Sequence, residues 1–256
     1  MTRNRVYDDE RLAGAYQRGN EMPEASLRDW TRLIGSFTDR PAPAIVEVGA
    51  GTGMFCAAAA RWLAPSTVVG VDPSAAMLAE AVRHHDRPAV HYLRGDAEAL
   101  PVRSGAFDLA LLSRVIHHLP DRPRVAGELA RVLRPGGVVV VRTTFRDRLD
   151  ALVYDYWPKL RELDRTRFPS ADEIREDFAS AGFTVRKVTS FARPVAVDLR
   201  TYHARLTARP QSKFGRLSPA EFEDGLDHLA ADARREGATG PVPVDERYDL
   251  MVLTAP

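Results

Sequence analysis

From residue 44 onward, short β-branched runs alternate with longer segments of helical periodicity, and this alternation constrains the fold more than any other feature of the chain. It predicts strands at 44–48, 67–72, 89–93, 107–112, 138–142, 183–189 and 247–253. Helices are expected at 54–64, 74–84, 122–133, 171–181, 198–208 and 219–235. Apolar strands joined by helices are typical of a parallel sheet covered on both faces, with ligands bound beyond the carboxyl ends of its strands. The sequence therefore predicts an α/β fold with a mostly parallel, seven-stranded sheet and helices on both faces.

The 256 residues fit a single domain, 1–256, because no linker is long enough to separate two. Two helices, expected at 8–17 and 23–37, form an N-terminal helical cover within residues 1–40. The alternating core follows at 41–145. A polar and aromatic insertion with a helix, 146–181, is expected to act as a lid, and residues 182–256 supply the last strands with helices inserted between them.

Charge and hydropathy argue against several classes of protein. Lys and Arg number 36 against 35 Asp and Glu, so the net charge of +1 gives no field of the kind that attracts nucleic acid. The apolar runs are far shorter than the roughly 18–20 residues that span a bilayer. The charged N-terminus has no apolar signal region, and the single Cys56, expected to pack in a helix, allows no internal disulfide. We therefore expect a cytoplasmic protein with no nucleic-acid or membrane partner, either a monomer or a homodimer.

The strongest local motif is VEVGAGTGMF, residues 46–55, at a predicted strand-to-helix turn. Gly49, Gly51 and Gly53 can adopt positive φ and have no Cβ, so the chain can turn sharply and a ligand can approach its backbone. Asp72 ends the next strand, where a carboxylate can accept hydrogen bonds from both ribose hydroxyls. Asp96 follows the third strand at the same edge and can accept from an adenine amine. The pattern indicates a nucleoside-binding site.

The spacing of the glycines separates two classes of nucleoside ligand. The dinucleotide fingerprint G-x-G-x-x-G places its third glycine where this chain has Met54, which disfavours a nicotinamide oxidoreductase. Glu47, just before the turn, is poorly suited to a phosphate and well suited to an ammonium group. The ligand is therefore expected to carry a cationic amino acid end.

These motifs resemble the class I S-adenosylmethionine-dependent methyltransferases, which have a Rossmann-like fold, and in particular the small-molecule branch that includes ubiquinone and menaquinone C-methyltransferases. The resemblance spans residues about 44–143 and rests on VEVGAGTGMF, GVDPSAAML, LRGDAEALP, FDLALLSRVIHHLPD and LARVLRPGGVVVV, in the order of the family. The final strands are similar to its C-terminal hairpin. The segment 208–229 also resembles a tail found in one subgroup, and the sequence assigns it no role.

By this resemblance, S-adenosylmethionine is the expected cofactor. The resemblance implies contacts to its methionine moiety, ribose and adenine from Glu47, Gly49, Gly51, Gly53, Asp72, Pro73, Met77, Asp96 and Ala97. Ser113 and Arg114 would lie near the amino acid end and the sulfonium. Tyr16 and Arg18, in AYQRG, look like the N-terminal segment that closes over the cofactor.

Methyl transfer from a sulfonium is an in-line displacement, so the enzyme mainly positions the two reactants. A general base is needed only when the nucleophile begins protonated, and His117 is the best candidate, with His118 beside it near the acceptor. A structural role for one or both histidines stays open. A metal site is disfavoured, because adjacent histidines point in different directions and no third ligand has suitable spacing.

Contacts to the methyl acceptor are expected from the insertion. Tyr154, Tyr156 and Trp157 form an aromatic segment that either closes over the site or packs as one face of a helix. Arg142 is a candidate for an anionic group on the acceptor, as are Arg146 and Arg148, although a solvated face is the alternative.

The sequence thus predicts methyl transfer from S-adenosylmethionine to carbon, nitrogen or oxygen of a small molecule in specialised or quinone-like metabolism. A non-catalytic S-adenosylmethionine-binding protein and a peptide methyltransferase remain as alternatives.

Overall fold

A seven-stranded sheet forms the centre of the computed structural model, which describes residues 9–237 and 240–256. The strand order is β3-β2-β1-β4-β5-β7-β6. The strands are β1 Ala44–Val48, β2 Thr67–Asp72, β3 Val90–Arg94, β4 Phe107–Ser113, β5 Leu133–Thr143, β6 Thr184–Ala196 and β7 Val244–Thr254. Among the strands of the described residues, β7 alone runs antiparallel to its neighbours, β5 and β6. The predicted Rossmann-like α/β fold is confirmed.

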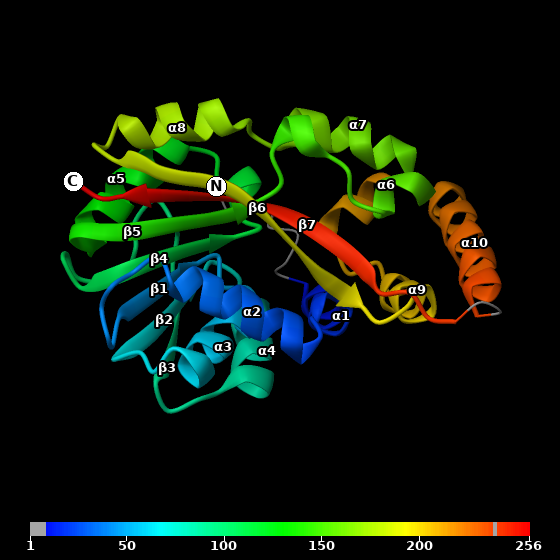
Figure 1. Ribbon diagram of the computed structural model, residues 1–256, viewed down its shortest axis with the longest axis horizontal. Helices are drawn as coiled ribbons and strands as arrows, with labels where there is room; N and C mark the ends of the chain where they lie inside the picture. The colour runs from blue at the N-terminus through cyan, green and yellow to red at the C-terminus, as the bar shows by residue number, and fades with distance from the viewer. Residues whose placement is uncertain (1–8, 238–239) are drawn as a thin grey trace.

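Helices cover the two faces of this sheet (Figure 1). Below it in the view lie α2 Glu24–Gly35, α3 Met54–Trp62 and α4 Ala75–His85, and above it lie α5 Arg122–Val132 and α8 Ala171–Ala179. Each face has its own apolar core, one around Trp30 and Phe55, the other around Leu129 and Phe178. The predicted helix at 8–17 begins outside the described residues, and α1 runs from Glu10 to Asn20. Among the described helices, none is long and apolar enough to cross a membrane.

The strand order brings several loops to one edge of the sheet. In the β1–β2 pair Val48 lies opposite Val71, and in the β4–β5 pair Ser113 lies opposite Arg142. The chain leaves β1 toward β2 on one side, whereas β4 lies on the other side of β1. This change of direction opens a crevice beyond the carboxyl ends of the strands, where open α/β sheets bind their ligands.

A second group of helices is built on the far end of β6 and β7. These strands stay paired from Thr184–Thr254 to Ala196–Val244, whereas β5 pairs only with Asp249–Thr254 of β7, so the pair projects beyond the sheet. Around the projection gather α6 Val153–Tyr156, α7 Pro158–Arg167, α9 Leu199–Leu206, the short 3-10 helix η4 Ser212–Arg216 and α10 Pro219–Glu236 (Figure 1). We call these five elements the helical module.

The helical module has its own apolar core. It includes Tyr154, Trp157, Leu160, Phe214, Phe222 and Leu229, all buried. The expected lid covered only residues 146–181, but the structure combines part of that segment with the helices between β6 and β7. This larger arrangement arises because α6 and α7 bury their apolar faces against α10 and η4 rather than lying singly over the sheet.

Candidate functional site

A cavity of about 720 Å³ opens at the carboxyl edge of the sheet, between the sheet and the helical module. A smaller recess of about 80 Å³ continues from it beneath α1. Tyr16, Gly51, Ser113, Arg114 and Tyr248 line both spaces. The two hollows therefore form one cleft.

The three glycines of the turn have different roles, although all have positive φ: +73° at Gly49, +54° at Gly51 and +80° at Gly53. A Cβ on Gly49 would lie 2.4 Å from Val115 Cγ2, and one on Gly53 would lie 2.3 Å from the Tyr92 hydroxyl. A Cβ on Gly51 would meet only Tyr16 Cε1, at 3.9 Å. Gly51 is thus the position where the missing side chain leaves space in the cleft itself.

Gly53 departs from the expected role. It does not line either part of the cleft, and it is the N-terminal capping residue of α3, packed against Tyr92. The structure therefore gives Gly53 a conformational role in the turn, while Gly49 and Gly51 border the cleft.

Asp72 organises the glycine turn as well as lining the cavity. Its Oδ2 accepts a hydrogen bond of 2.8 Å from the Gly51 backbone, and its Oδ1 accepts one of 2.9 Å from the Ser74 backbone. The other residues expected on the nucleoside side also line the cavity, namely Pro73, Met77, Asp96 and Ala97.

Glu47 lies buried at the end of β1 and borders the smaller recess. Removal of its carboxyl from water raises the pKa of Glu47 to about 8. Cys56 donates its thiol proton to Glu47 Oε2 over 3.0 Å, and burial raises the pKa of this thiol well above its ordinary value. As expected, Cys56 packs in a helix, α3. Without a ligand, Glu47 is therefore mostly neutral at pH 7, and a cationic group beside it would favour its ionised form.

Arg142 was expected to bind an anionic group of the acceptor, but the structure places it outside the large cavity. Its guanidinium is buried, 3.7 Å from the ring centre of Tyr248 and 4.4 Å from that of Trp30, and it donates to Ser113 Oγ over 3.2 Å. Burial lowers the pKa of Arg142 to about 10, so it stays charged at neutral pH. It borders the smaller recess behind Ser113 and not the large cavity. The aromatic rings hold its charge at the base of the cleft.

The N-terminal helix closes one side of the cleft through Arg114. This residue follows β4 with a positive φ of +58°, which is strained for a side chain larger than glycine. It donates to Asn20 Oδ1 over 2.8 Å, and its guanidinium lies 6.0 Å from the Tyr16 ring centre. Tyr16 therefore borders the cleft as expected, but Arg18 is exposed on α1 and lines neither space.

Both histidines line the large cavity. His117 stacks on Phe168 with ring centres 4.2 Å apart, and its Nδ1 is buried with no hydrogen-bond partner among the described residues. Burial lowers the pKa of His117 well below its ordinary value. The pKa of His118 is lowered to about 4, mainly by burial and further by the positive charges of Arg167 and Arg114. Part of the His118 ring nevertheless stays open to the cavity. Both rings are neutral at pH 7 and can accept a hydrogen bond.

Of Tyr154, Tyr156 and Trp157, the three aromatic residues expected to contact the acceptor, Tyr154 alone lines the cavity. Trp157 is 2% exposed, stacks on Phe222 at 5.6 Å and donates from Nε1 to the Phe222 carbonyl over 3.1 Å. Tyr156 donates to Asp232 on α10 over 2.9 Å. Trp157 and Tyr156 are therefore corrected from acceptor contacts to packing residues of the helical module, because their helix turns them toward α10.

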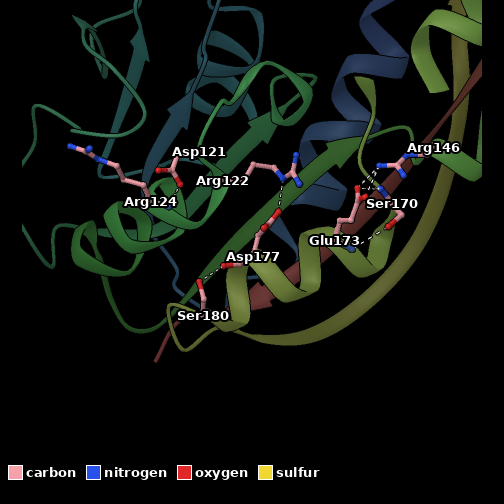
Figure 2. A network of polar contacts seen from close by, with 8 residues as sticks. All are labelled: Asp121, Arg122, Arg124, Arg146, Ser170, Glu173, Asp177 and Ser180. Atoms are coloured by element: carbon pink, nitrogen blue, oxygen red, sulfur yellow. Dashed lines mark hydrogen bonds and ion pairs between the residues drawn. The ribbon is translucent and has the colours of Figure 1, made fainter. Parts of the chain in front are cut away.

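Arg146 and Arg148 are held by carboxylates away from the cavity. Figure 2 shows Arg146 directed at Glu173 of α8, with which it forms an ion pair of 2.5 Å. The same glutamate closes the capping box of α8 with Ser170. Arg148 pairs with Asp249 over 3.1 Å. These two arginines tie the start of the insertion to the sheet and to α8.

Sequence reasoning missed several cavity residues that come from the helical module and from β7. The missed residues that line the large cavity include Arg167, Phe168, Gln211, Lys213, Arg216, Glu246 and Tyr248. The sequence singled out the segment 208–229 without a role, and that segment supplies Gln211, Lys213 and Arg216. Nothing local to α7 or β7 distinguishes the others from residues of an ordinary helix or strand. In the described parts of the chain, no group of three or more His, Cys, Asp or Glu side chains is arranged to hold a metal ion.

Comparison with known proteins gives a consistent result. Residues 46–141 match a family model described as a methyltransferase domain. The chain is 38% identical over 127 residues to trans-aconitate 2-methyltransferase of Deinococcus radiodurans, covering 50% of this chain and 46% of that protein. It is 30% identical over 188 residues to demethylmenaquinone methyltransferase of Thermus thermophilus, covering 63% of this chain and 84% of that protein.

The same fold is found in the crystal structure of a protein described as a methyltransferase from an antibiotic biosynthesis pathway of Anabaena variabilis. It matches with a TM-score of 0.69 at 24% identity, over 88% of this chain and 99% of that one. The chain spans about half the length of the first curated relatives that it matches.

Proposed function

Because the chain belongs to the class I S-adenosylmethionine-dependent methyltransferases of the small-molecule type, we propose that it transfers a methyl group from S-adenosylmethionine to a small-molecule acceptor. The observation that carries this proposal is the cleft itself, in which a glycine turn and the carboxyl groups of Glu47, Asp72 and Asp96 border one continuous space. The relatives support an enzyme over the alternative of a non-catalytic binding protein.

The residues of the cleft fit S-adenosylmethionine by their chemistry. Gly51 leaves open the space that a side chain would fill, and Glu47 is a buried acid suited to an ammonium group. Asp72 and Asp96 are suited to ribose hydroxyls and an adenine amine. We propose that these four residues hold the cofactor, with Gly49, Pro73, Met77, Ala97, Tyr16, Ser113 and Arg114 around it.

When bound, the cofactor supplies an electrophilic methyl group on a sulfonium. The chain has to orient the acceptor and limit access of water, and holding two reactants in line can contribute about 7–11 kcal/mol. Tyr154, His117 and Phe168 supply the aromatic part of the wall on the acceptor side of the cavity. We propose that His117 Nδ1, buried and without a described partner, accepts a hydrogen bond from an acceptor hydroxyl or amine. Its depressed pKa keeps it neutral for that purpose.

The test of this proposal is ligand binding followed by product analysis. S-Adenosylhomocysteine at a hundred times its Kd should stabilise the folded chain by about 2.7 kcal/mol and raise the Tm, because it binds the folded state alone. NADH, as the matched nucleoside control, should leave the Tm unchanged. Methylated products are then sought by mass spectrometry across an acceptor library. A chain that binds NADH and not S-adenosylhomocysteine would refute the proposal.

The acidity of Glu47 predicts a pH dependence of cofactor binding. With a pKa of about 8, Glu47 is mostly protonated at pH 7 in the empty cleft, whereas a ligand ammonium favours its ionised form. Binding should therefore release a proton. As the pH is raised toward 8, affinity should increase by roughly tenfold per pH unit. Calorimetry in two buffers of different ionisation enthalpy measures the proton, and Glu47→Gln should abolish its release. Equal affinity at pH 6 and pH 8 in the unaltered chain would contradict this assignment.

A further inference from the structure

The acceptor side of the large cavity carries an excess of positive charge. Its wall includes Arg167 at the end of α7, Lys213 and Arg216 in η4, and Arg114 after β4. Arg247 also lines the cavity, but it pairs with Asp150 over 2.7 Å. The elements that supply these cations are far apart in the sequence and meet only where the helical module closes over the sheet.

The carboxylates in this wall are too few to balance the cations. Asp164, which is 1% exposed, lies between Arg167 and Lys213, 3.8 Å from an Arg167 nitrogen and 4.0 Å from Lys213 Nζ. The same carboxylate accepts a hydrogen bond of 2.9 Å from the Tyr154 hydroxyl. Glu246, the other acidic residue on this side, accepts a hydrogen bond of 2.6 Å from the Tyr248 hydroxyl. Asp164 is therefore shared between two cations, Arg167 and Lys213.

The titration behaviour of the neighbouring groups is consistent with this excess. Lys213 is only 16% exposed, and burial lowers its pKa because removal from water destabilises the charged ammonium form. Arg167, Arg114 and Arg216 act on His118 in the same direction, lowering its pKa. A cavity that gathers partly buried cations around one shared carboxylate is stabilised when a further anion enters it.

We infer that Lys213, Arg167 and Arg216 form a subsite for an anionic group, a carboxylate or a phosphate, carried by the methyl acceptor. This inference rests on the proposed function and goes beyond it by naming the chemical class of the acceptor. The bidentate fork of Arg167 and the ammonium of Lys213 both suit such oxygens. The adjoining aromatic wall of His117 and Phe168 would contact the uncharged part of the acceptor.

The decisive experiment measures anion binding to the chain saturated with S-adenosylhomocysteine. Citrate serves as the carboxylate probe, inorganic pyrophosphate as the phosphate probe and glycerol as the uncharged control, each titrated by calorimetry. At least one anion should bind and glycerol should not, and the stronger of the two anions identifies the group. Lys213→Gln and Arg167→Gln should each weaken that anion at least about tenfold, the range of a lost hydrogen bond to a charged group. Affinity for S-adenosylhomocysteine should stay within twofold.

Two further variants separate the subsite from general charge effects and from misfolding. Lys187→Gln removes the same charge from the exposed surface of β6, outside the cavity, and should bind the anion as the unaltered chain does. Arg216→Gln alters an exposed side chain of the wall and should still weaken the anion if Lys213→Gln fails to fold. Equal weakening by Lys187→Gln, or no anion binding, would overturn the inference.

The same anion titrations are run on the chain without S-adenosylhomocysteine. Failure of S-adenosylhomocysteine to bind would count against the proposed function, whereas the anion result judges the subsite separately.

Discussion

Replacing Gly51 with valine is expected to reduce affinity for S-adenosylhomocysteine by roughly a hundredfold, about 2.8 kcal/mol at 1.4 kcal/mol per factor of ten. The backbone there has a φ of +54°, which disfavours any side chain and a β-branched one most. The added carbons would also project into the space beside Tyr16, where the cofactor is proposed to lie. Calorimetric titration measures the affinity, and thermal unfolding without ligand measures the accompanying loss of stability.

Gly105 provides the matched control for that strain. It has a similar φ of +58°, and a Cβ there would meet nothing within 4 Å. Gly105→Val should therefore lose a comparable amount of folding stability while keeping its affinity for S-adenosylhomocysteine, because Gly105 does not line the cleft. If Gly51→Val bound this ligand as tightly as Gly105→Val, the turn would not be the cofactor site.

Trp157→Ala is expected to have the largest effect on stability. Truncation of a buried aromatic side chain of this kind costs about 3–5 kcal/mol. Trp157 contacts Phe214 and Phe222. It also packs closely against Gly225 of α10, where an added Cβ would lie 2.3 Å from Trp157 Nε1. The loss corresponds to a decrease in Tm of about 6–20 °C for a chain of this size. Scanning calorimetry measures it, and a second transition would show the helical module unfolding before the sheet.

Tyr156→Phe is the comparison variant for Trp157→Ala. It removes only the hydroxyl that bonds to Asp232, an interaction worth about 1 kcal/mol, and leaves the ring in place. Its Tm should fall by only a few degrees. If instead Trp157→Ala kept its Tm and raised the KM for an acceptor, Trp157 would contact the acceptor after all and its assignment to packing would be wrong.

The sheet was predictable because its signals are local. The runs at 44–48 and 67–72 were predicted with the bounds of β1 and β2, since apolar, β-branched strands between helices give a pattern within a few residues. β6 departs furthest from its predicted bounds, although β5 and β7 also begin before the predicted residues. β6 was expected to end at 189 and continues to Ala196, through half-buried residues that pair with β7. That pairing depends on a partner strand about fifty to sixty residues later in the chain, which no local pattern contains.

The residues that line the proposed nucleoside side of the cleft were predictable for a related reason. Gly49, Gly51, Asp72 and Asp96 each lie at the end of a strand, and parallel strands place such ends along one edge. The sequence did not predict that Gly53 and Arg18 lie outside the cleft. Gly53 packs against the Tyr92 ring, and Arg18 lies on the exposed side of α1. Both placements depend on packing between segments that are distant in the chain.

The residues on the proposed acceptor side of the cavity could be identified only from the three-dimensional structure. From the residues alone, Tyr154 and Trp157 are equivalent aromatics, and Arg146 is as good an anion-binding candidate as Arg167. In the structure α10 covers Trp157, Glu173 pairs with Arg146, and the closure of the helical module brings Arg167 and Lys213 to one carboxylate, Asp164. The sequence by itself determined the strands of the sheet and the residues at their carboxyl ends, where we propose that the nucleoside binds, because both depend on patterns within a few residues of chain. Tertiary structure alone decided which side chains line the proposed acceptor side of the cavity, because they come from helices separated by about forty-five residues of chain. The free energy of burying the apolar faces of these helices selects which faces remain at the cavity.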